Sequence, residues 1–341
     1  MICNIVKHKN IQSLADDWQR IYSNNHSLTA FDSYLFAKNI AHDYIYRFKA
    51  AISPEFWSVS FDSQVKIIVP LSYNYKTKSY NLLHACNGSD YCNIVYDSNV
   101  SAQQMADCLW KLSIKLRNPL IISMLPGGVV SEALNILNIK PTLQIDNAII
   151  KLNNYKSHQD YISHLSKNAR QNLRTAYNRL NRDNLANSIN ISNKVDYSEL
   201  KAIMGLYENR HTSRYGLSSN PLKSVYLKKY NYSTRSLFNS VEGLHARLYI
   251  DNTLAAFMSG YARDGRWIIP RLSINGRFCF YSPGIILIDK VIKWMYDNGF
   301  EILDLGLGTE PYKFQMGAEI FHSFNYLIHN DKDNASIINP R

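Results

Sequence analysis

The sequence predicts an α/β protein built on mixed, mostly antiparallel twisted sheets flanked by helices. Three observations carry this prediction. Strand-like apolar runs are joined by the tight-turn pairs Asp251-Asn252 and Asp264-Gly265. Apolar residues recur at helical spacing from Ile162 to Leu180. A helix start at Ser282-Pro283-Gly284 follows the strand-rich region.

Length and charge set the next limits. The chain has 341 residues, more than one ordinary core organises, so we expect two domains, residues 1–150 and 151–341. Its formal charge of +11 favours acidic partners: nucleic acid, anionic lipid, or a phosphate-rich molecule such as coenzyme A or a nucleotide sugar. Lys and Arg are scattered rather than clustered, which disfavours nucleic acid and membrane.

Cysteines and apolar runs indicate the compartment. The five cysteines stand at unpatterned spacings, and no Cys/His cluster has the spacing of a zinc site, so we expect free thiols and no metal. The N-terminus shows no signal-peptide core, and no apolar run approaches the ~20 residues that span a bilayer. These features predict a soluble, cytoplasmic protein.

After two initial helices, the first half is expected to contain three strands, a helix, a fourth strand, a short helix and a fifth strand. The predicted helices lie near residues 11–24, 28–42 and 101–116, and the predicted strands at 57–61, 65–75, 80–86, 120–125 and 148–152. Pro126-Gly127-Gly128 precedes a short helix.

The second half shows the same order more clearly. We expect helices at 162–180 and 197–211, separated by a polar Asn-rich stretch, and then strands at 244–250, 253–261 and 266–272. The helix that begins at Ser282 ends at Gly299, and strands at 301–305 and 321–329 close the domain. Only the second half has the Ser-Pro-Gly helix start, so only this half is expected to hold a cofactor.

The helix start is an expected anion site. Ser282 is a favoured N-cap residue, Pro283 fits the first turn, and Gly284 lets a ligand approach the backbone. Unpaired N–H groups and the helix dipole there attract an anion. Arg271 and Arg277 flank the start and are able to pair with phosphates, although both also fit solvated arginines.

A meander of strands, a crossover helix with an anion-binding start, and a strand parallel to the last meander strand resemble the order of the GNAT acyltransferases. The segments Tyr281–Gly284, Asp304–Gly308, Tyr312-Lys313 and Ser166–Arg174 are similar to the CelD-like branch, which is related to the Fem-type aminoacyl transferases. The resemblance covers about residues 155–329, and the weaker first half fits a tandem arrangement of two such domains. The usual phosphate loop, Gln/Arg-x-x-Gly-x-Gly/Ala, is replaced here by Asn275-Gly276-Arg277 and Ser282–Gly284.

The resemblance implies an acyl-coenzyme A site where the two parallel strands separate. The candidate catalytic residues are Asp304, Tyr312 and His245. The candidate coenzyme A ligands are Arg271, Ser273, Arg277, Ser282, Gly284 and Lys313, and the candidate acceptor ligands are His211, Arg214 and Arg247. Each has a structural alternative: a buried carboxylate for Asp304, a packed aromatic for Tyr312, a surface lysine for Lys313 and a structural imidazole for His245. Lys313 also has a second possible role, which is to order the loop.

The predicted function is an N-acyltransferase that moves an acyl group from a coenzyme A thioester to the amine of a nucleotide-linked amino sugar (dTDP- or UDP-) for surface polysaccharide such as O-antigen or capsule. No GxSxG, HExxH or Walker pattern occurs, and direct attack of an amine on a thioester needs no protein nucleophile. One alternative is a Fem-like, aminoacyl-tRNA-dependent transferase, with Lys167, Arg170 and Arg174 facing RNA. Another is a non-catalytic scaffold or nucleic-acid-binding protein that uses its charge alone.

Overall fold

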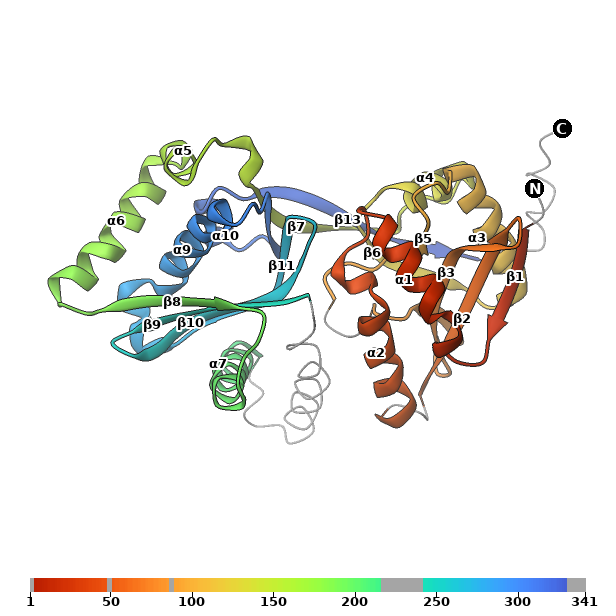
Figure 1. Ribbon diagram of the computed structural model, residues 1–341, viewed down its shortest axis with the longest axis horizontal. Helices are drawn as coiled ribbons and strands as arrows, with labels where there is room; N and C mark the ends of the chain where they lie inside the picture. Colours follow the sequence, from red (N-terminus) through yellow and green to blue (C-terminus); the bar gives the residue numbers. More distant parts are fainter. Residues whose placement is uncertain (1–2, 48–50, 86–88, 216–241, 330–341) are drawn as a thin grey trace. The chain divides into compact units, whose positions relative to one another are not determined.

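The computed structural model describes residues 3–47, 51–85, 89–215 and 242–329, with only the backbone described for 43–47, 197 and 208–215. The chain divides into two compact units (Figure 1). The first consists of residues 1–145 and 322–341, and the second of residues 146–321. The chain enters the second unit within β7 (Leu143–Lys151) and returns to the first within β13 (Glu319–Ile328).

The first unit is a mixed sheet with helices packed on it. Its strands pair in the order β1-β2-β3-β4-β6-β13, and only the β4–β6 pair is parallel. The elements are β1 (Cys3–His8), α1 (Ala15–Asn24), α2 (Tyr34–Arg47), β2 (Ile52–Phe61), β3 (Gln64–Asn74), β4 (Ser79–Leu82), β5 (Val95–Tyr96), α3 (Ala102–Leu116), β6 (Leu120–Leu125) and α4 (Val129–Ile136).

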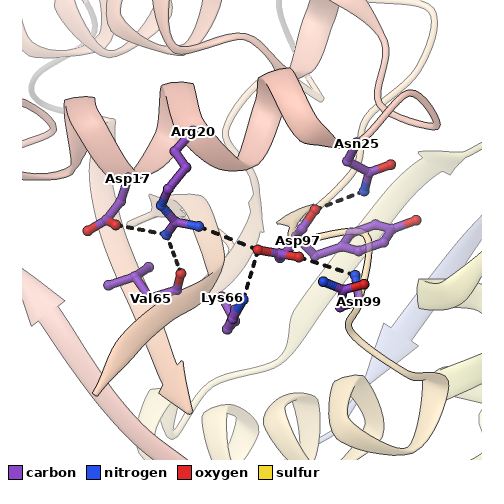
Figure 2. A network of polar contacts seen from close by, with 8 residues as sticks. Asp17, Arg20, Asn25, Val65, Lys66, Asp97 and Asn99 are labelled. Carbon is purple, nitrogen blue, oxygen red and sulfur yellow. Dashed lines mark hydrogen bonds and ion pairs between the residues drawn. The ribbon is translucent and has the colours of Figure 1, made fainter. Parts of the chain in front are cut away.

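A buried polar network fastens α1 to this sheet (Figure 2). The carboxylate of Asp97 accepts hydrogen bonds from the ammonium of Lys66 at 3.0 Å and from the backbone N–H of Asn99 at 3.2 Å, and it pairs with Arg20 of α1 at 3.4 Å. Burial alone would raise the pKa of Asp97, but these contacts outweigh burial and lower it. The network therefore stabilises the unit with Asp97 ionised.

In the first unit, residues 89–97 occupy the space beside the parallel strands β4 and β6. Strands β4 and β6 are in register only at Tyr80↔Leu120 and Asn81↔Ile121. Residues 89–97 are all buried, and the N–H of Cys92 donates to the carbonyl of Met124 at 3.2 Å. The edge of β6 that β4 leaves is therefore occupied by the loop itself.

The second unit is a sheet with helices on both faces. Its strands pair in the order β7-β12-β11-β10-β9-β8, and only the β11–β12 pair is parallel. The elements are α5 (His158–His164), α6 (Lys167–Arg182), β8 (Asn187–Ser192), α7 (Tyr197–Tyr215), β9 (Gly243–Ile250), β10 (Thr253–Arg263), β11 (Arg266–Ile274), α9 (Pro283–Asp297), β12 (Ile302–Leu307) and α10 (Pro311–Gln315).

Side chains alternate between the two faces of this sheet, as strand geometry requires. Leu244, Ala246 and Leu248 of β9 belong to the larger core, which α6 and α9 cover. The smaller core lies on the other face, where Ile203 and Met204 of α7 pack with residues of β10. Figure 1 shows α6 and α9 on one side of the strands and α7 on the other.

The structure confirms the two hairpin turns. Asp251 and Asn252 have φ values of 48° and 58°, and Asp264 and Gly265 have 48° and 73°. Positive φ at both central residues defines the type I′ turn, whose twist matches the adjoining strands. The meander β9-β10-β11 therefore follows from the local sequence.

Three expectations need correction. The helix predicted at 162–180 is two helices, because Leu165 is extended and the Ser166 hydroxyl caps α6 by accepting the N–H of Ala169. The Asn-rich stretch contains an edge strand, β8, that pairs with β9. The last strand, β13, pairs with β6 of the first unit and does not close the second.

Candidate functional site

Strands β11 and β12 run parallel for only three residue pairs, Arg266↔Ile302, Trp267↔Leu303 and Ile268↔Asp304. Beyond Ile268 strand β11 continues to Ile274 without further pairing to β12. The β10–β11 register also shifts here, so that three steps along β11 match two along β10. Pro270 lies in this bulge, where its missing N–H costs no ladder hydrogen bond. The two strands therefore separate at a defined point.

Gly260 is required at the bulge. A Cβ on this residue would lie 1.8 Å from the carbonyl oxygen of Ile268, closer than atoms approach without bonding. The close backbone approach bends β11 at the last residue that pairs with β12. The separation of the strands is thus built into the packing of β10 against β11.

Helix α9 begins beside the separated strand. Pro283 is its first residue, as expected, but Ser282 does not cap it in the expected way: its φ is 52° and its hydroxyl accepts no cap hydrogen bond. The carbonyl of Ser282 instead accepts the N–H groups of Ile285 and Ile286. Gly284 lies against Ile274 of β11, since a Cβ on this glycine would be only 3.3 Å from that side chain.

The rest of α9 is anchored by a buried carboxylate. Asp289 accepts the hydroxyl of Tyr177 at 2.6 Å and lies 2.9 Å from the imidazole of His158. Burial, together with the charge of Asp289, raises the pKa of Tyr177 far above its usual range, so the phenol stays protonated and donates. These contacts join α9 to α5 and α6.

Lys313 organises the turn that follows β12. Its ammonium is 2% exposed and donates to the carbonyls of Gly306 at 3.3 Å, Leu307 at 2.6 Å and Gly308 at 3.1 Å. It also lies 3.1 Å from the carboxylate of Glu310. The alternative of a surface lysine is wrong, because Lys313 is buried, and these contacts are those of a residue that orders the loop.

Asp304 is fully buried and lies in an ion pair. One carboxylate oxygen accepts from Arg266 at 2.5 and 3.1 Å, and the other accepts the N–H of Gly306 at 2.8 Å. Tyr312, at the start of α10, packs against the larger core. Among these three candidates, Asp304 and Lys313 make contacts that position the end of β12.

The other candidates gather beneath α7. His245 and Arg247 of β9 and Arg271 and Ser273 of β11 are buried on the face that α7 covers. Arg247 donates to Glu199 at 2.8 Å, and to Asn190 and Ser192 of β8 at 2.7 and 2.8 Å. The Ser273 hydroxyl donates to the carbonyl of Leu206, and the Arg271 guanidinium lies 5.8 Å from the Tyr207 ring centre.

The remaining candidates are on the surface or lie outside the described side chains. Arg277 is exposed in the turn between β11 and α9. His211 and Arg214 belong to α7, but their side chains fall outside the residues that the structure describes. The structure thus brings His245, Arg271 and Ser273 to one face of the sheet and leaves Arg277 and Gly284 at the start of α9.

Sequence reasoning missed Ser259, Arg266 and Glu199. Glu199 neutralises Arg247 from α7, and Arg266 neutralises Asp304 from the neighbouring strand. A signal for Arg266 was present, because a charged residue opens a strand whose parallel neighbour carries a lone aspartate. No local signal marks Ser259, because only the strand register places it between His245 and Arg271.

The outer face of α6 carries donors, and its last one, Arg182, is paired at 2.8 Å with the carboxylate of Asp183, which follows the helix. Lys167, Gln171, Arg174, Asn178 and Arg182 are all exposed and share the helix side opposite its buried stripe. At the C-terminal end, the ring of Phe280 is half exposed and Arg179 stacks on it at 4.4 Å.

Comparison with known proteins shows which fold this chain has. Residues 167–314 match the family model of the acetyltransferase (GNAT) domain. A tandem GNAT protein from the clavulanic acid biosynthesis pathway superposes with a TM-score of 0.53 at 9% identity, covering 96% of this chain and 99% of that one. The fold is of the tandem GNAT type.

Two further solved structures share this fold. FemX superposes with a TM-score of 0.65 at 11% identity, covering 99% of this chain and 100% of that one. The C-terminal domain of a putative lysylphosphatidylglycerol synthetase from Agrobacterium fabrum has a TM-score of 0.57 at 12% identity, covering 96% and 94%. No curated protein matches the sequence.

Two features are absent from the part of the chain that the structure describes. No group of three or more His, Cys, Asp or Glu side chains is placed there to bind a metal ion. None of the described helices combines the length and apolar character needed to cross a bilayer.

Proposed function

We propose that the protein transfers an acyl group from a coenzyme A thioester to a primary amine, in a ternary complex and by direct attack. The observation that carries this proposal is the separation of β11 from β12 at the Pro270 bulge, with the start of α9 packed against Ile274 of the separated strand, within a GNAT fold. The gap between two parallel strands admits a narrow arm such as pantetheine. A backbone N–H at the bulge is suited to polarise the thioester carbonyl.

The proposed contacts with coenzyme A are made by residues at the start of α9. Gly284 presents a backbone without a side chain, and the exposed Arg277 is free to swing toward a pyrophosphate. Ser282 contributes its backbone, since its hydroxyl makes no cap. Asp304 and Lys313 act as positioning residues for the turn after β12, and Tyr312 is the proposed proton donor to the departing thiolate.

The acceptor that we propose is an amino sugar linked to a dTDP or UDP nucleotide, used for surface polysaccharide. A formal charge of +11 favours an anionic acceptor of this kind. Arg271 and Ser273, predicted as coenzyme A ligands, are buried under α7, and for this reason we propose that they lie near the acceptor instead. His211 and Arg214, on α7, remain proposed acceptor ligands.

A thermal-shift series tests the donor and the acceptor separately. Acetyl-coenzyme A, longer acyl-coenzyme A esters, dephospho-coenzyme A and a panel of nucleotide amino sugars are added to the full chain. Stabilisation by coenzyme A esters at concentrations near 100 Kd should correspond to about 2.7 kcal/mol. The donor proposal fails if no coenzyme A species raises the melting temperature.

Arg277→Glu should weaken coenzyme A binding about tenfold, since it replaces a phosphate-pairing cation by an anion. Arg117→Glu, an exposed arginine of the first unit, is the matched control and should bind normally. Equal affinities of both variants, measured by calorimetry, would remove Arg277 from the site.

A second function has one observation in its favour. The exposed Lys167 and Arg174 on the outer face of α6 fit the phosphates of an aminoacyl-tRNA donor. The double variant Lys167→Gln/Arg174→Gln would then lose tRNA binding and its steep salt dependence. Unchanged binding of coenzyme A by this variant, with no tRNA binding by the wild type, would leave the first function standing alone.

A further inference from the structure

A row of polar side chains crosses the sheet of the second unit beneath α7. The β8–β9 register places Ser192 opposite His245, and the β9–β10 register places His245 opposite Ser259. Ser259 in turn lies opposite Arg271 of β11. Directly opposed residues of antiparallel strands have Cβ atoms about 5 Å apart, so each side chain in this row neighbours the next.

Ser259 is the unusual member of the row. Its side chain is 1% exposed, and its hydroxyl has no hydrogen-bond partner among the described residues. The neighbouring hydroxyls are used: Ser273 donates to Leu206, and Ser192 accepts from Arg247. Buried hydroxyls are rarely left unpaired in native proteins, so an unpaired one indicates a place for a bound group or water.

The position of Ser259 connects it to the separated strands. The β10–β11 register shifts immediately after Ser259, and Arg271 is the β11 residue that opposes it. Arg271 lies in the part of β11 that no longer pairs with β12. The row therefore begins at the edge where the thioester is proposed to lie and ends at the edge strand β8, where Ser192 is partly exposed.

The charged groups around the row favour the uncharged form of an amine that enters it. The cations are Arg271 on β11 and Arg247 on β9, and from α7 the row is faced by Tyr207, against Arg271, and Glu199, which is paired with Arg247 and with the Tyr249 hydroxyl. Cations on both sides disfavour a bound ammonium and, once it has taken up the proton, an imidazolium, so the proton moves on from both groups. An ammonium that enters this row therefore loses a proton and becomes the uncharged, nucleophilic amine.

We propose that Ser259 receives the acceptor amine and relays its proton to His245, from which the proton leaves past Ser192 at the edge of the sheet. This inference rests on the proposed acyl transfer. An N–H bond of the ammonium breaks as the Ser259 oxygen takes the proton, and the Ser259 O–H proton passes to the His245 imidazole. The neutral amine then forms the C–N bond and the C–S bond breaks. Tyr312 protonates the thiolate, and the second amine proton restores the Tyr312 hydroxyl, so one proton is released to solvent overall.

The relay is tested first without any assay of activity. Nitrogen-15 shifts of the His245 ring are followed from pH 5 to 9 in the wild type and in Ser259→Ala, with His245→Gln to assign the signals. The titration midpoint of His245 should move in Ser259→Ala and stay unchanged in Ser72→Ala, a control serine buried in β3 of the first unit. Identical titrations in wild type and Ser259→Ala would overturn the relay, whether or not the protein transfers acyl groups.

Kinetics with the acceptor found by thermal shift provide the second test. Ser259→Ala should lower kcat about 100-fold with coenzyme A affinity unchanged, because general acid–base steps contribute about 10² to 10⁴ in rate. Its rate should rise with pH toward the pKa of the free amine, and Ser259→Thr should restore much of the rate. A wild-type pH profile in Ser259→Ala would overturn the relay and leave the proposed transfer intact.

Discussion

The guanidinium of Arg266, in the first residue pair at which β11 and β12 are in register, pairs with the carboxylate of Asp304, in the last. The sequence leaves two interpretations of Asp304 open, catalytic and structural. With one oxygen held by Arg266 and the other by the Gly306 amide, the contacts are those of a positioning group. The pair fixes the point from which the strands diverge.

Replacing Arg266 tests this pair. Arg266→Met should lower the free energy of unfolding by about 3 kcal/mol, because it leaves the carboxylate of Asp304 buried and uncompensated. The double variant Arg266→Met/Asp304→Asn should recover part of the loss. Urea denaturation measures both, and a loss below about 0.5 kcal/mol in the single variant would show that the pair contributes little.

Gly260 makes the second prediction at this scale. Gly260→Ala should destabilise the protein by roughly 3 kcal/mol, since its methyl group meets the Ile268 carbonyl and the backbone must move. Gly205→Ala in α7 is the control, because nothing lies within 4 Å of its added carbon. The control should be neutral or more stable by up to about 1 kcal/mol. Equal melting temperatures would contradict the close approach.

At the scale of elements, the turn after β12 depends on a residue that lies outside it. The buried ammonium of Lys313 binds three successive carbonyls from the first turn of α10. Because the end of β12 borders the proposed thioester site, this turn has to be ordered before any ligand arrives.

Lys313→Met should therefore lower the melting temperature of the ligand-free protein, with roughly 2–3 kcal/mol lost from hydrogen bonds to a charged group. Calorimetry with coenzyme A and dephospho-coenzyme A should show the same proportional loss for both. A variant that keeps wild-type stability but loses affinity for coenzyme A alone would instead place Lys313 on a phosphate.

At the scale of the whole molecule, the two units share a strand order but differ in what lies beside the parallel pair of strands. In the second unit β11 leaves β12, and the start of α9 follows. In the first unit residues 89–97 are buried beside β6, and Cys92 bonds to it. This filling supplies a physical reason for the expectation that only the second half holds a cofactor.

Acid should destabilise the first unit selectively. Burial lowers the pKa of His84 to about 4 from its ordinary value of 6.5. Between these values the unfolded chain binds a proton that the folded unit does not, so stability is present above pH 6.5 and falls by about 3 kcal/mol as pH drops to 4. Asp97, with its lowered pKa, adds a further loss below its ordinary value of 3.8.

Hydrogen exchange followed by mass spectrometry resolves the two units. Peptides from residues 51–85 should lose protection between pH 6.5 and 4, after correction for intrinsic exchange, more than peptides from β9 and β10. His84→Gln should flatten this dependence. Parallel loss in both units, or no effect of the substitution, would contradict the assignment to His84.

Local features were predictable because their causes are local. The I′ turns at Asp251-Asn252 and Asp264-Gly265 require left-handed backbone that Asp, Asn and Gly tolerate, and β6 was predicted at its observed bounds. Strand β8 was missed because an edge strand of alternating Asn, Ser and Ile carries little apolar signal. The break between α5 and α6 was missed because the apolar spacing continues across it.

The sequence by itself determined the α/β class and the order of the meander, the helix and the strand that follows it, since periodicity and turn chemistry act over a few residues. The parallel direction of that strand was what the resemblance to the GNAT acyltransferases implied. Only the tertiary structure decided which polar residues meet. Strand register placed Ser259 between His245 and Arg271 and gave β13 to the first unit. Side-chain contacts paired Asp304 with Arg266 and turned the Lys313 ammonium toward the carbonyl of Leu307. Register depends on contacts between distant segments, so no local pattern reveals it.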